Sequence, residues 1–70
     1  MRFGERFKKL RLENNLTQTQ VATELGIDQT NISLWENDKT RPEYENLIKL
    51  SKLYDVTLDE LLGVDFLLNK

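Results

Sequence analysis

Residues 16–37 read LTQTQVATELGIDQTNISLWEN, and this stretch decides the fold. Thr17 and Gln20 fit a capping box at the start of a helix over 18–25, and Gly26 follows the last apolar residue of that helix. Asp28 is a suitable N-cap for a second helix, predicted over about 28–37. Two short helices joined by a turn that contains glycine are typical of a helix-turn-helix.

Helical periodicity gives the helix over 28–37 an inner and an outer side. Ile32 and Trp35 share the inner side, so we expect Trp35 in the core rather than stacked on a ligand. The outer side is short, polar and almost uncharged. Amide side chains pair with adenine edges, hydroxyls with several base edges, and an apolar tip packs on a thymine methyl. The candidate base-contacting residues are therefore Gln29, Thr30, Ser33 and Leu34.

Three further helices are predicted around this pair. A stripe of Phe3, Phe7 and Leu10 indicates a helix over 3–14, which Asn14 and Asn15 would end. A loop over 37–42 leads into a helix over 43–54, for which Pro42 presets the first turn. The apolar side of that helix is read as Leu47, Ile48, Leu50, Leu53 and Tyr54. Thr57 and Glu60 form a second capping box, which opens a helix over 58–62.

No segment has the pattern of a strand, so the predicted fold is all-α, with a five-helix domain over 1–63 and an apolar tail over 64–70. The chain has 70 residues and contains no cysteine and no histidine. Disulfides, thiol nucleophiles, histidine triads and the usual zinc sites are thereby excluded. The carboxylates are scattered and no glycine-rich phosphate loop occurs, so we expect no enzyme, no cofactor and no small-molecule ligand.

The charges are segregated along the chain although the formal net charge is only −2. Residues 1–11 hold five bases and one acid, residues 12–38 hold no base, and Lys39 and Arg41 follow. The basic cluster at the start has two readings, a solvated helix face or a set of phosphate contacts. Gln18 at the start of its helix is a candidate phosphate contact, because free amides and the helix dipole favour anions there. With no apolar run long enough for a signal peptide or a membrane span, we expect a cytoplasmic, nucleoid-associated protein with no membrane partner.

Four segments together resemble one family: GERFKKLR at 4–11, the central stretch, KTRP at 39–42 and NLIKLSKLYDVTLDELLG at 46–63. The chain resembles the lambda-repressor-like helix-turn-helix proteins of bacteria and phages, of the Cro and repressor type. The resemblance implies that the third helix enters the DNA major groove and that Arg11 and Glu36 form an ion pair between the first and third helices. It also implies contacts with DNA phosphates, at positions that match Gln18, Asn31, Asn37, Lys39 and Arg41.

The chain departs from the family pattern after the third helix. Asp38 stands where glycine is usual, which places a negative charge near the expected phosphates. Leu34 stands where a long polar side chain is common, and Glu43 where a small hydroxyl residue is common. On this reading, replacing Asp38 with glycine would strengthen DNA binding.

The leading hypothesis is a sequence-specific regulator of transcription, a repressor, that binds double-stranded DNA as a homodimer on a palindromic operator. The candidate dimer contacts are Leu58, Leu62, Phe66 and Leu67. The tail has a second reading, in which it folds back on the core of its own monomer. The alternative function is an antitoxin or another regulatory module that binds a protein partner. Only DNA binding would weaken steeply with salt.

Overall fold

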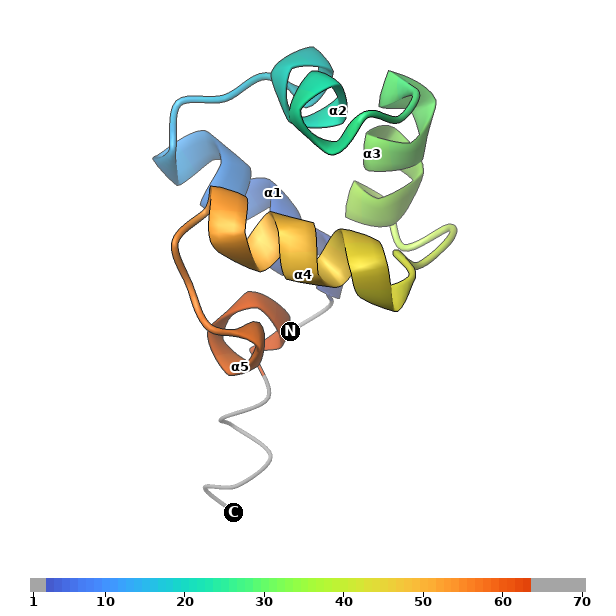
Figure 1. Ribbon diagram of the computed structural model, residues 1–70. Helices are drawn as coiled ribbons and strands as arrows, with labels where there is room; N and C mark the ends of the chain where they lie inside the picture. Colours follow the sequence, from blue (N-terminus) through green and yellow to red (C-terminus); the bar gives the residue numbers. More distant parts are fainter. Residues whose placement is uncertain (1–2, 64–70) are drawn as a thin grey trace.

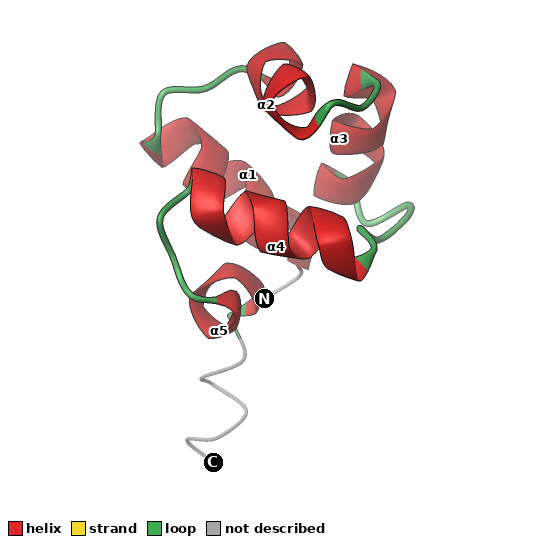
Figure 2. Cartoon of the chain, in the orientation of Figure 1, coloured by secondary structure: helices red, strands yellow, loops and turns green. Residues whose placement is uncertain are grey.

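The computed structural model describes residues 3–63. The elements in chain order are α1 (Phe3–Glu13), α2 (Gln18–Leu25), α3 (Gln29–Glu36), α4 (Tyr44–Leu53) and α5 (Leu58–Leu62), and the described residues contain no strand (Figure 2). In Figure 1, α2 and α3 lie at one end of the molecule and α5 at the other, with α1 and α4 between them. The all-α, five-helix prediction is confirmed, and the predicted bounds differ only by residues that cap the helices.

Local capping explains where three of the helices, α2, α3 and α5, begin. The Thr17 hydroxyl accepts a hydrogen bond from the Gln20 amide at 3.1 Å, and the Gln20 side chain accepts one from the Thr17 amide at 2.8 Å. Thr57 and Glu60 make the same reciprocal pair at the start of α5. The Asp28 carboxylate accepts from the Thr30 amide at 2.8 Å, and this hydrogen bond lowers the pKa of Asp28. Each bond satisfies an amide that has no partner within its own helix.

Left-handed residues explain where the helices end. Gly26 and Gly63 have φ of 72° and 67°, as glycine allows at no steric cost. Asn15, Asp38 and Asp55 adopt the same conformation, with φ of 58°, 58° and 55°. Asparagine and aspartate are the residues besides glycine that visit this region most readily. Asn15 ends α1, as its position in the sequence predicted.

The core draws on every helix. Buried apolar residues come from α1 (Phe7, Leu10), α2 (Val21, Ala22, Leu25), α3 (Ile32, Trp35), α4 and its cap (Leu50, Tyr54) and α5 (Leu61). The Trp35 side chain is only 6% exposed, which confirms its predicted place in the core. The small residue Ala22 is buried near the crossing of α2 and α3, so these two helices pack closely.

Two predictions about α4 are wrong. Ile48 is 45% exposed. Leu47, Leu50 and Tyr54 form the inner side of α4, and Ile48, the residue after Leu47, is rotated away from that side. The helix begins at Tyr44, so Pro42 lies before it, and the N-cap Glu43 makes no side-chain hydrogen bond to the first turn. Among residues 3–63, no helix is both long and apolar enough to cross a membrane.

Candidate nucleic-acid interface

A buried ion pair fixes α3 against α1. The Arg11 guanidinium donates to the Glu36 carboxylate twice, at 2.6 and 3.0 Å, and a third bond reaches the Leu16 carbonyl at 2.9 Å. Both residues are buried. The hydrogen bond to Glu36 raises the pKa of Arg11, although burial opposes the increase. The guanidinium therefore stays charged, and it donates to both oxygens of the Glu36 carboxylate.

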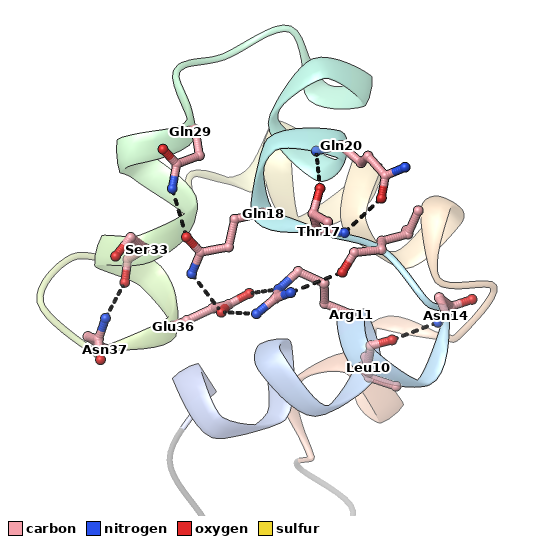
Figure 3. Close-up of polar contacts among 11 residues, drawn as sticks. Leu10, Arg11, Asn14, Thr17, Gln18, Gln20, Gln29, Ser33, Glu36 and Asn37 are labelled. Carbon is pink, nitrogen blue, oxygen red and sulfur yellow. Dashed lines mark hydrogen bonds and ion pairs between the residues drawn. The ribbon is translucent and has the colours of Figure 1, made fainter.

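From Glu36, two glutamine amides lead to the surface (Figure 3). Gln18 Nε2 donates to Glu36 Oε1 at 3.1 Å, and Gln29 Nε2 donates to Gln18 Oε1 at 2.8 Å. Because a carboxylate only accepts, Gln18 must turn its NH₂ group toward Glu36 and its oxygen toward Gln29. Gln29 must then give one N–H to Gln18. Within residues 3–63 the Gln29 side chain makes no further hydrogen bond, so its Oε1 and its second N–H are available at the exposed start of α3.

The predicted outer side of α3 divides into an exposed and a half-buried part. Gln29 and Thr30 are exposed at its first turn, whereas Ser33 and Leu34 are half-buried. Asn37 is exposed, and its Nδ2 donates to the Ser33 carbonyl at 2.8 Å, which helps to end the helix. The first turn of α3 is thus the part that is open to a large partner. Gln18, at the start of α2, is half-buried.

Two hollows flank α3. One, of about 280 Å³, lies toward α1, and its lining includes Lys8, Gln18 and Asn37 together with acidic side chains. The other, of about 310 Å³, lies toward the start of α4, and its lining includes Asn31, Thr40 and Arg41. Four of the five residues predicted to contact phosphates are therefore divided between the two sides of α3, and Lys39 lines neither hollow.

The basic residues of α1 differ in their surroundings, which the sequence alone did not reveal. Arg6 donates to the Glu60 carbonyl at 2.6 Å and so connects α1 with α5. Lys8 lines the same hollow as Gln18. It lies one helical turn after Gly4, which packs against the end of α3, so both residues are on the side of α1 that faces α3. The sequence alone did not distinguish Lys8 from the other basic residues of the first helix as a candidate for DNA contact.

The basic pair after α3 also divides. Lys39 is exposed, and its backbone amide donates to the Leu34 carbonyl at 2.9 Å. The Arg41 guanidinium lies over the ring of Phe3, 5.9 Å from its centre, in a cation–π contact. Within residues 3–63, the Arg41 side chain is thus engaged with Phe3, whereas the Lys39 side chain is exposed to a partner.

Comparison with known proteins agrees with this architecture. A family model described as helix-turn-helix matches residues 7–61. The chain belongs to the lambda-repressor-like helix-turn-helix family. Its fold matches the crystal structure of the P22 c2 repressor in complex with a synthetic operator, with a TM-score of 0.83 and 34% identity over 89% of this chain and 94% of that chain.

Curated relatives of this helix-turn-helix family are transcription regulators and control proteins. The chain is 46% identical over 63 residues to the transcriptional activator BcrR of Enterococcus faecalis, covering 90% of this chain and 31% of the activator. It is 40% identical over 64 residues to the control protein C.MunI of a Mycoplasma species, covering 90% of this chain and 86% of that protein. The chain spans about a third of the length of BcrR and about half the length of two other curated relatives.

The predicted dimer patch of this lambda-repressor-like chain is only partly described. Leu58 is 42% exposed on α5. Leu62 packs against the core of its own monomer and lines a hollow with Phe3 and Phe7. Phe66 and Leu67 lie outside the described residues. Of the four candidates, Leu58 is the one whose side chain the structure places at the surface.

Proposed function

We propose that this chain is a sequence-specific, double-stranded-DNA-binding regulator of transcription that places α3 in the major groove. The observation that carries the proposal is the hydrogen bond from Gln29 Nε2 to Gln18 Oε1, which orients the exposed Gln29 amide. Its free Oε1 can accept from adenine N6 while its remaining N–H donates to N7, which is the two-bond pattern that identifies adenine in the major groove. Thr30, Ser33 and Leu34 would read the neighbouring base pairs.

The DNA backbones would pass along the two sides of α3. Gln18, Asn37 and Lys8 line the hollow toward α1, and Asn31 and Arg41 line the hollow toward α4. Gln18 is also the first residue of α2, where backbone amides lack helical partners and favour phosphate oxygens. Lys39 would add a contact beyond the end of α3. Such contacts set the position of a protein on DNA and leave sequence reading to α3.

The proposed regulator acts as a homodimer and represses by occupying a promoter, a mode that requires DNA binding alone and no catalysis. One α3 buries too little DNA to reach the usual specific affinities. Two copies would place their α3 helices about 34–36 Å apart on a palindromic site. The exposed Leu58 and the apolar tail at 64–70 are the proposed contacts between the copies.

Selection of bound sequences from a random duplex pool, followed by measurement of one variant, tests the proposal. Gln29→Ala should weaken binding to the selected site by about 1–3 kcal/mol and relax the preference at one or two base pairs in each half-site. Lys52→Ala, an exposed change on α4, is the control. Equal weakening of Gln29→Ala on selected and scrambled duplexes would exclude base reading. Binding that hardly changes with salt would favour the protein-interaction alternative.

Sedimentation of the intact chain and of a chain that lacks residues 66–70 tests the dimer. The intact chain should associate at tens of micromolar, about the range of a weak interface, and the trimmed chain should be a folded monomer. If trimming unfolds the chain, the tail belongs to the core of the monomer.

A further inference from the structure

The turn after α3 has the hydrogen-bond pattern of a Schellman motif. The Lys39 amide donates to the Leu34 carbonyl at 2.9 Å, and the Asp38 amide donates to the Trp35 carbonyl at 3.2 Å. Asp38 occupies the left-handed position at which glycine is most common, with φ of 58°. Because an aspartate carries a penalty there that glycine avoids, its side chain calls for a separate explanation.

That side chain reaches across to α1. Asp38 Oδ1 accepts a hydrogen bond from the Gly4 amide at 3.0 Å, between residues 34 positions apart in the chain. Gly4 lies in the first turn of α1, where amides have no helical partner and a negative charge is favourable. Asp38 therefore supplies from a distant segment the cap that a residue before a helix normally supplies.

The partner of Asp38 must be a glycine, because α1 and α3 approach closely at this point. A Cβ atom on Gly4 would lie 2.4 Å from the Glu36 carbonyl oxygen and 2.7 Å from the Trp35 carbonyl oxygen. Those two carbonyls belong to the last turn of α3. The start of α1 and the end of α3 are therefore in contact in two ways. Gly4 lets the two backbones approach closely, and Asp38 accepts a hydrogen bond from the Gly4 amide.

This contact holds the segment that carries Lys39. Glu36 is held by Arg11 and Asp38 is held by Gly4, so α1 fixes the chain on both sides of Asn37. Lys39 follows directly, and its amide belongs to the same turn. Without the carboxylate at 38, the turn would keep its backbone bonds to α3 but lose its hydrogen bond to the Gly4 amide of α1.

We infer that Asp38 is a positioning residue, whose carboxylate sets the place of Lys39 against the DNA backbone by tying the turn after α3 to the start of α1. The inference rests on the proposed DNA-binding function. It reverses the expectation from the sequence, which treated Asp38 only as a charge that repels phosphates. A repelling charge and a positioning carboxylate predict opposite effects for Asp38→Gly.

Three variants separate these readings. Asp38→Asn keeps an oxygen acceptor and removes the charge, whereas Asp38→Gly keeps the left-handed turn and removes both. Asp55→Gly is the matched control, because Asp55 has the same conformation after α4, with Val56 donating to the Ser51 carbonyl at 2.9 Å. No side-chain hydrogen bond of Asp55 occurs within residues 3–63.

Binding to the selected duplex and to a scrambled one should be measured at several salt concentrations. Asp38→Gly should weaken binding to the selected duplex by about threefold to tenfold, as expected for the loss of one hydrogen bond, while Asp38→Asn stays within about twofold of the parent chain. Asp38→Gly should also lower the salt slope by about one, as Lys39→Ala does, and the double variant should show little further loss. Asp55→Gly should change neither quantity.

Hydrogen exchange of the Gly4 amide, measured without DNA, reports the contact by itself. Exchange should be faster in Asp38→Gly than in Asp38→Asn or Asp55→Gly. If both Asp38 variants bind DNA more tightly, Asp38 acts as a repelling charge and the inference is wrong. If Gly4 exchanges faster but binding and salt slope stay unchanged, the contact only stabilises the fold and the inference is also wrong. If the parent chain selects no duplex, the proposed function fails, and the exchange result still reports the contact.

Discussion

Removal of Arg11 should destabilise this domain more than almost any other change of a charged residue. Arg11→Met deletes two hydrogen bonds to Glu36 and one to the Leu16 carbonyl. The Glu36 side chain is 3% exposed, so the variant leaves a buried carboxylate whose remaining donor among the described residues is Gln18. Breaking a buried pair in this way costs about 3–5 kcal/mol. A domain of this length has a total stability of about 4–10 kcal/mol, so the variant should lie near the edge of unfolding.

Urea denaturation followed by circular dichroism at pH 7 measures this loss. With a slope of about 1 kcal/mol/M, the midpoint should fall by about 3–5 M. Lys9→Met is the matched control, because Lys9 is exposed on the same helix, and its effect should stay within about 0.5 kcal/mol.

A double variant tests the physical reason for the loss. Arg11→Met combined with Glu36→Met removes the stranded carboxylate together with its partner, so it should be more stable than Arg11→Met alone. If the two single losses simply add, or if Arg11→Met costs less than about 1 kcal/mol, the pair does not act as a coupled buried unit.

Three further predictions follow from the capping contacts and the exposed lysine. Gly4→Ala should destabilise the fold by about 1–3 kcal/mol in thermal or urea unfolding, because the new Cβ would meet the Glu36 carbonyl, whereas Glu5→Ala next to it should have little effect. The hydrogen bond from Thr30 lowers the pKa of Asp28 in the folded state, so its contribution is present above the unfolded pKa of about 3.9 and is lost as the pH falls through the folded value. As the pH falls from about 5 to about 2, the stability of Asp28→Asn should accordingly fall less than that of the parent chain, and parallel slopes would contradict this. Lys39→Ala should weaken binding to all duplexes alike and reduce the salt slope by about one, and an unchanged slope would remove Lys39 from the interface.

The sequence predicted the features that depend on neighbouring residues. The capping boxes at Thr17 and Thr57 and the cap at Asp28 involve residues two or three positions apart, so they can be read from the chain. The core positions of α2 and α3 follow from helical periodicity. The misplacement of Ile48 shows the limit of that reasoning, since an apolar residue can lie beside the inner side of a helix without joining it.

The contacts that fix the candidate site join distant residues and could not be read in the same way. Gln18 and Glu36 are 18 positions apart, and Gly4 and Asp38 are 34 positions apart. Nothing local in the sequence shows that Gly4 is a point of close approach or that Asp38 accepts a bond from it. The charge of Asp38 was visible and its partner was not, and the sequence therefore assigned it a repelling role.

The two glutamine amides have a consequence for how base preference can change. The orientation of Gln29 depends on Gln18, and that of Gln18 depends on a carboxylate buried under α3 and held by Arg11. Under the proposed function, the base preference of Gln29 therefore depends partly on residues that do not contact DNA bases. A screen for variants with altered operator preference should return substitutions at Gln18 alongside those at Gln29, although Gln18 is half-buried and its amide is turned toward Glu36.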